Sequence, residues 1–215
     1  MCTCGKTGPN RRRLLTGMAA LAAFGRLRPA IAMPSGSGTL RQGHGEVLIN
    51  GRPAPVGSAV AAGDTVAAGP GAQAVFTLGD DAFLLRSDGA VTVSDGPAGR
   101  EVSLESGRVL SVFGPKQITL KTPHANVGIR GTAVYLESHS VSTNVCVCYG
   151  RAVMIPTGDP AGAEEVATRH HDAPRQIFPA GRRPVMEPYR VTNHADEELV
   201  MLEALLGRVP PFVAK

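Results

Sequence analysis

Two cysteines and two histidines are the side chains of this 215-residue sequence whose types and spacing best suit chemistry. Cys146 and Cys148 are one residue apart in a strand-forming run, so both thiols are expected on the same face of a strand. His170 and His171 follow after a loop long enough to fold back, and Asp172 is a candidate acceptor for one imidazole. Two thiolates and two imidazoles suit tetrahedral zinc, cuprous copper or an iron–sulfur centre. The sequence therefore predicts a metal site at these four residues.

Three other interpretations of these residues stay open. The thiols are also consistent with ordinary core residues, because cysteine is among the most buried residue types. A strained, redox-active Cys-x-Cys disulfide is the second alternative, since near neighbours on one strand lack relaxed disulfide geometry. The histidines are also consistent with a polar surface loop, and their spacing from the cysteines matches no known zinc finger.

Motifs typical of enzymes are missing from the sequence. It contains no Gly-x-Ser-x-Gly elbow, no phosphate-binding glycine loop and no His-Glu-x-x-His pattern. A hydrolytic zinc site would need an open coordination position and a general base nearby. We therefore expect a binding protein and not an enzyme.

Short strands separated by glycine turns are the elements that must position the cysteines. They run from Thr39 to about Ile155, and several alternate apolar and polar residues with the period of a half-buried strand. Asn50-Gly51 closes one of them and is a strong hairpin signal. No amphipathic helix interrupts the series. The pattern predicts an all-β fold, either a barrel, a sandwich or a stacked solenoid.

The segment from Thr122 to Thr132 reads Thr-Pro-His-Ala-Asn-Val-Gly-Ile-Arg-Gly-Thr. With Gly63–Val66, Ala74–Leu78 and Leu104–Val109 it resembles, over roughly residues 45–137, the FecR-type periplasmic domain. The resemblance implies a β-solenoid, in which each turn buries apolar side chains against the next, and an exported sensing or ligand-binding module.

His124 and Arg130 lie in this segment and are expected to face the same way, because they are six residues apart in an alternating strand. Arg130 is a candidate for binding a carboxylate or phosphate ligand in its guanidinium fork. The alternative is that Arg130 closes the turn beside Gly131 by bonding backbone carbonyls.

Residues 1–32 have the features of a secretory signal. A basic stretch from Asn10 to Leu15 leads into a short apolar run, and Ala30-Ile31-Ala32 supplies a signal peptidase site. Adjacent arginines before two leucines resemble a twin-arginine signal, which predicts a periplasmic or secreted protein. Its removal leaves 16 basic and 18 acidic side chains, so nothing basic favours nucleic acid or an anionic membrane. Of the four cysteines, only Cys146 and Cys148 would remain.

The rest of the chain divides into residues 39–155 as the β-domain, 156–192 as an irregular segment rich in proline and glycine, and 193–215 as a helix and tail. Asn193 or Thr192 is expected to cap the helix. Its apolar stripe is predicted to cover an open end of the sheet and consists of Leu199, Leu202, Leu205 and Leu206. We expect no membrane span, no anti-sigma segment and no anchoring helix.

Taken together, the sequence predicts an exported FecR-like binding or sensing module of the cell envelope that binds a metal through the Cys-x-Cys and His-His residues. Its expected partner is an envelope protein or a small ligand. One alternative is a metal- or redox-active periplasmic protein in which the β-domain is only a scaffold. Another is a structural adaptor without a metal.

Overall fold

The computed structural model describes residues 37–190 and 193–213. The expected signal segment, and Thr192 as a helix cap, lie outside the described residues. The described chain forms strands up to residue 188, interrupted by one short 3-10 helix, and then a single α-helix. The all-β class and the C-terminal helix predicted from the sequence are confirmed.

The strands of the first half are β1 (Ser37–His44), β2 (Val47–Ile49), β3 (Arg52–Pro53), β4 (Ala59–Ala61), β5 (Thr65–Ala68), β6 (Gln73–Leu78), β7 (Asp81–Leu85) and β8 (Gly89–Gly96). Those of the second half are β9 (Gly99–Val112), β10 (Gln117–Lys121), β11 (Ala125–Arg130), β12 (Ala133–His139), β13 (Ser142–Pro156), β14 (Glu164–Thr168), β15 (Arg175–Ile177) and β16 (Met186–Pro188). The 3-10 helix η1 spans Pro160–Gly162 and α1 spans Asp196–Leu205. The Asn50-Gly51 hairpin joins β2 to β3, with both turn residues at positive φ, as the sequence predicts.

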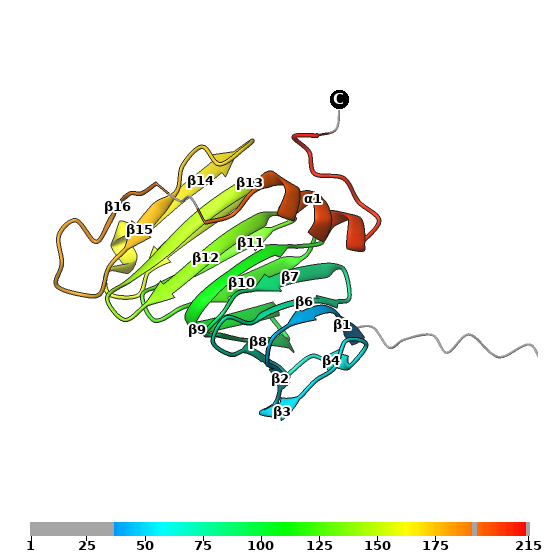
Figure 1. Ribbon diagram of the computed structural model, residues 1–215. Coiled ribbons are helices and arrows are strands. Elements are labelled where there is room, and N and C mark those ends of the chain that lie inside the picture. The colour runs from blue at the N-terminus through cyan, green and yellow to red at the C-terminus, as the bar shows by residue number, and fades with distance from the viewer. Residues whose placement is uncertain (1–36, 191–192, 214–215) are drawn as a thin grey trace, which may run out of the picture. The chain divides into compact units, whose positions relative to one another are not determined.

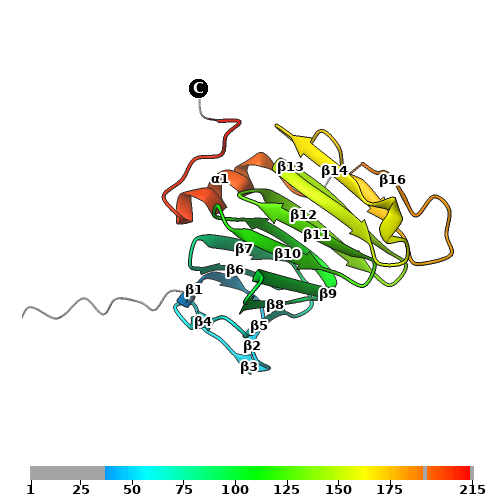
Figure 2. The same ribbon diagram turned by 180° about the vertical axis from the view of Figure 1, so that it is seen from behind.

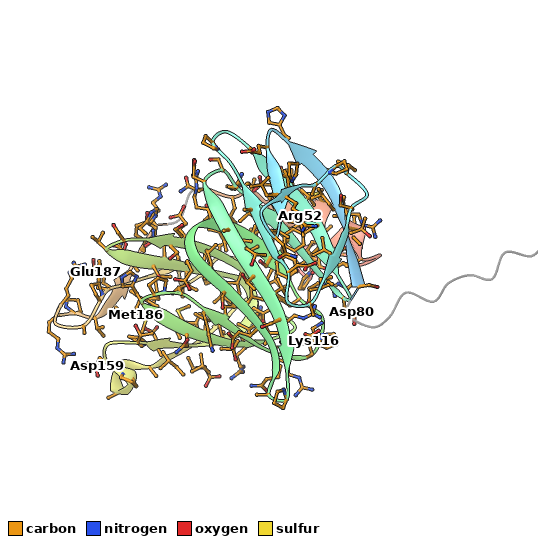
Figure 3. The ribbon with its side chains drawn as sticks, turned by 90° about the horizontal axis from the view of Figure 1, so that it is seen from below. Arg52, Asp80, Lys116, Asp159, Met186 and Glu187 are labelled. Atoms are coloured by element: carbon orange, nitrogen blue, oxygen red, sulfur yellow. The ribbon has the colours of Figure 1, made fainter. Side chains whose placement is uncertain are left out.

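The strands form one continuous sheet that folds into two facing layers, sheet A and sheet B, and each layer contains strands from both parts of the chain. Sheet A has the order β4-β1-β6-β7-β9-β12-β13-β15-β16. Sheet B has the order β3-β2-β5-β8-β9-β10-β11-β13-β14. Both layers advance in roughly chain order, from the β2–β4 end to the β14–β16 end (Figure 1). Figure 3 labels Arg52 of β3 and Met186 of β16, which lie at opposite ends.

Two long strands, β9 and β13, cross from one layer of the sheet to the other. Each changes sheets at a glycine with φ of +98°, Gly107 in β9 and Gly150 in β13. A Cβ on Gly107 would lie 2.4 Å from the Cα of Gly89, and one on Gly150 would lie 2.9 Å from Thr132 Oγ1. Glycine therefore permits both the left-handed backbone and the close approach at these corners.

The main hydrophobic core fills the space between the two layers. Alternate residues of β8, β10 and β11 are buried, which is the period expected for strands with one covered face. Phe76 and Phe83 stack with ring centroids 4.7 Å apart, and Phe113 meets Phe83 edge-on at 5.7 Å. This core extends along both sheets to Val145 and Val147 of β13.

A buried ion-pair network joins the start of β9 in sheet B to the start of β7 in sheet A. Arg100 donates to Asp81 at 2.6 Å and to Asp95 at 2.7 Å, and Lys116 Nζ lies 3.0 Å from Asp81. Asp81 also accepts the amide of Gly114, so its fully buried carboxylate is well satisfied. The hydrogen bond from Arg100 lowers the pKa of Asp95, although partial burial opposes this shift.

The helix α1 packs on the outer face of sheet A, as Figure 2 shows from behind. Leu199 and Leu202 are fully buried there in a second apolar cluster that includes Leu84 and Leu110. Glu198 holds the helix start by accepting the backbone amide of Ala195. The same carboxylate forms an ion pair with Arg86, whose Nη2 lies 2.8 Å from Glu198 Oε2.

Two sequence-based expectations about the fold need correction or are not confirmed. Residues 156–192 are not simply irregular, because β14, β15 and β16 lie there and pair with the edges of both sheets. These strands satisfy backbone groups that β13 would otherwise leave unpaired. The solenoid is not confirmed, since neighbouring strands are antiparallel except for β9 and β10. None of the helices described is long and apolar enough to span a membrane.

Candidate metal centre

The two thiols come from the outer face of β13. Val145 and Val147 point into the main core, whereas Cys146 and Cys148 point to the opposite side, toward α1. This alternation confirms the prediction that both thiols share one face. Both are buried and free, so the disulfide alternative does not describe this structure.

His171 reaches the thiols from the turn that follows β14. Its backbone amide donates to the carbonyl of Cys148 at 2.9 Å, and its Nδ1 lies 3.4 Å from Cys146 Sγ. The backbone of His171 is left-handed, with φ of +53°. Asp172 holds this turn by accepting the Arg169 amide and the Thr168 hydroxyl. Asp172 therefore shapes the loop and does not bind an imidazole as the sequence suggested.

His194 completes the cluster from the segment just before α1. Its Nε2 lies 3.4 Å from Cys148 Sγ and 3.0 Å from His171 Nδ1. The ring stacks on Tyr135, with centroids 4.5 Å apart. The preceding residue, Asn193, is anchored because its amide donates to Glu137 and its carbonyl accepts from Arg86.

One ligand atom from each of Cys146, Cys148, His171 and His194 lies within 4.8 Å of the other three. A tetrahedral ion with bonds of about 2.0–2.3 Å separates its ligand atoms by roughly 3.3–3.8 Å. The two sulfur–nitrogen distances of 3.4 Å fall inside that range, and the nitrogen–nitrogen distance of 3.0 Å is slightly shorter. The four donors thus fit a single ion after small side-chain movements. An iron–sulfur cluster is larger than one ion and would hold its ligands farther apart.

The same contacts shift the pKa values of the two thiols in opposite directions. A hydrogen bond from Cys148 lowers the pKa of the Cys146 thiol, and His171 and His194 lower it further against the effect of burial. Burial raises the pKa of the Cys148 thiol. The hydrogen bond to Cys146 raises the pKa of His171. Without a metal, proton sharing among these groups therefore favours a Cys146 thiolate beside a His171 imidazolium.

His170 does not join the thiols, although the sequence predicted it as a ligand. Its Nε2 instead lies 2.8 Å and 2.9 Å from the two carboxylate oxygens of Asp196 at the solvent side. The left-handed backbone of His171 directs its side chain toward β13, whereas the side chain of His170 is directed to the carboxylate of Asp196. Sequence reasoning missed His194 because it is 46 residues from Cys148. The available signal was its position at the predicted start of the C-terminal helix.

The other predicted pair, His124 and Arg130, is not brought together. His124 is buried, with its Nδ1 3.3 Å from Thr143 Oγ1, and burial lowers its pKa. Arg130 is exposed at the far end of β11, where it lines a surface pocket. The turn beside Gly131 is closed by Thr132, whose hydroxyl bonds the carbonyls of Arg130 and Arg151. The expected turn-closing role therefore belongs to Thr132.

Comparison with known proteins places this fold. Residues 64–153 match the model of the family described as FecR protein. Two crystal structures of a candidate anti-sigma factor from Parabacteroides distasonis ATCC 8503, at 1.65 and 2.50 Å resolution, superpose with a TM-score of 0.50. Each shares 13% identity and covers 65% of this chain and 64% of that protein, so the similarity spans just under two thirds of it. No curated protein matches the sequence.

The family match contains only half of the candidate metal centre. Both thiols lie inside residues 64–153, whereas His171 and His194 lie beyond that range. The family match and the similarity to the two crystal structures both concern the β-sheet region of this chain. The chain therefore carries a FecR-like domain.

Proposed function

We propose that this protein is an exported FecR-like binding and sensing module of the cell envelope that holds one metal ion at Cys146, Cys148, His171 and His194. The observation that carries the proposal is the convergence of these four donors from three separate segments of the chain. Two sulfur and two nitrogen ligands favour zinc, with cuprous copper as the other ion of suitable softness.

The role is binding rather than catalysis. All four positions of a tetrahedral ion are taken by side chains, whereas catalytic zinc sites keep one position for water or substrate. The thiols are also buried beneath α1, which limits access of a substrate to the ion. The candidate anti-sigma factor with this fold supports a sensing role with a protein partner. Arg130 stays a predicted contact for an anionic ligand or partner.

Metal content of the protein isolated after export tests the proposal. We expect one zinc or copper ion per chain in the wild type. The Cys146→Ser/Cys148→Ser double variant and His194→Ala should lose it. His44→Ala is the matched control, because His44 is an exposed histidine of β1 outside the cluster, and it should keep the metal. A wild type that retains neither zinc nor copper after loading with each ion would refute the metal site.

Export through the twin-arginine route is a separate part of the proposal. It is supported by the Arg11-Arg12-Arg13-Leu14-Leu15 run and by the Ala30-Ile31-Ala32 motif. Replacing Arg11, Arg12 and Arg13 with lysine should leave the protein in the cytoplasmic fraction with residues 1–32 attached. Unchanged processing and export of that variant would contradict this route.

A further inference from the structure

The carboxylate of Asp196 stands directly behind the candidate metal centre. Asp196 is the first residue of α1, and its Oδ1 lies 3.1 Å from His171 Nε2. Both oxygens of the same carboxylate also contact Nε2 of His170. The opposite nitrogen of His171, Nδ1, faces Cys146 Sγ and His194 Nε2. One imidazole thus connects a carboxylate to the thiol cluster.

The chemistry of imidazole determines which nitrogen of His171 carries the proton in this arrangement. A neutral imidazole carries a proton on one nitrogen and a lone pair on the other, and an ionised carboxylate can only accept a hydrogen bond. In the neutral form that a metal ligand must adopt, His171 donates Nε2–H to Asp196, and the lone pair of Nδ1 is then aimed at the thiols. A metal-bound histidine commonly has such an outer carboxylate, which fixes its tautomer and raises its basicity.

We propose that Asp196 is a positioning residue that holds His171 as an Nδ1 ligand of the metal. This inference rests on the proposed metal site and adds a residue outside the four ligands. His194 lacks an equivalent partner, since its Nδ1 has no hydrogen-bond partner among the described residues and its ring is held by stacking on Tyr135. Among the four candidate ligands, Asp196 therefore contacts His171 and not His194.

A structural role in the helix is the main competing explanation, and the chain offers a matched control for it. Asp196, Glu197 and Glu198 all lie in the first turn of α1, where acidic residues interact favourably with the helix dipole. Glu197 is exposed and belongs neither to the four candidate ligands nor to the group formed by His170, His171 and Asp196. Asp196→Asn and Glu197→Gln each remove one first-turn charge with almost no change in shape, but only the former alters the contact with His171.

Zinc affinity, measured by competition with a chromophoric chelator, is the first test. Asp196→Asn should weaken zinc binding by roughly 10–100-fold, whereas Glu197→Gln should stay within about twofold of the wild type. Equal affinities for the two variants would overturn the positioning role. If the wild type binds no zinc, the proposed function fails, and the second measurement still decides the role of Asp196.

The second measurement is the tautomer of His171 in metal-free protein. Long-range proton–nitrogen NMR spectra are recorded at a pH high enough to make the imidazole neutral. The wild type and Glu197→Gln should show the Nε2–H form, and Asp196→Asn should show a larger share of the Nδ1–H form. An unchanged tautomer in Asp196→Asn would overturn the inference whether or not zinc binds.

Discussion

Removal of the metal is expected to loosen the start of α1 more than the strands at the opposite end of the sheet. His194 lies two residues before α1, and Asp196 is the first residue of α1. Any opening that lifts this segment from sheet A therefore separates His194 from the thiols of β13 and breaks the site. The metal adds its binding free energy to the cost of such openings and adds nothing to fraying elsewhere.

The size of this stabilisation follows from the zinc concentration relative to its Kd. Zinc at a hundredfold excess over its Kd stabilises the bound state by about 2.7 kcal/mol. Since 1.4 kcal/mol corresponds to a factor of ten, backbone amides of α1 that exchange through this opening should exchange about 100-fold more slowly. Apolar contacts of Leu199 and Leu202 hold α1 even without metal, so the helix should loosen and not unfold completely.

Hydrogen–deuterium exchange with mass spectrometry measures this directly, with and without zinc. The internal control is β4, an edge strand of sheet A that is expected to exchange by local fraying and lies at the other end of the order. Exchange in β4 should stay unchanged. His194→Ala should abolish the effect of zinc on α1. Equal slowing in β4 and α1, or slowing that persists in His194→Ala, would refute the reasoning.

Three further predictions concern the backbone and the buried charges. In metal-free protein, His171→Gly should be more stable than His171→Ala, because φ of +53° strains alanine more than glycine. Urea unfolding should show a difference of about 0.5–1 kcal/mol in the free energy of unfolding. A more stable alanine variant would contradict this. Asp81→Asn should cost about 3–5 kcal/mol and lower the Tm by about 6–20 °C, because it leaves the buried Arg100 without one partner; a Tm within 2 °C of wild type would argue against it. Arg100 lowers the pKa of Asp95 in the folded state, so the stabilisation from Asp95 is present above its unfolded pKa of about 3.9 and is lost as the pH falls through its folded pKa. The stability difference between wild type and Asp95→Asn should therefore shrink below about pH 4 in acid unfolding curves, and a constant difference would count against the ion pair.

Local patterns explain which parts of the fold could be predicted from sequence. Period-2 alternation and the Asn50-Gly51 turn are short-range signals, and both correspond to observed strands and turns. The crossing of β9 and β13 between sheets was not predicted. It depends on how Gly107 and Gly150 approach distant backbone, which their neighbours in sequence do not reveal.

The candidate metal centre shows the same limit. The shared face of Cys146 and Cys148 follows from strand geometry alone and was predicted correctly. The choice of His171 over His170 depends on a left-handed turn, and the contribution of His194 depends on where α1 packs. Neither can be inferred from spacing, because tertiary contacts decide both.

Electronic absorption of the cobalt-substituted protein tests the central claim most directly. Cobalt(II) in a tetrahedral site with two thiolates gives intense visible bands and sulfur-to-metal charge transfer. We predict one cobalt per chain with this spectrum, its loss in His194→Ala, and its retention in His170→Ala, which removes the neighbouring histidine outside the thiol cluster. A wild type without these bands, or a spectrum that survives His194→Ala and disappears in His170→Ala, would contradict the account.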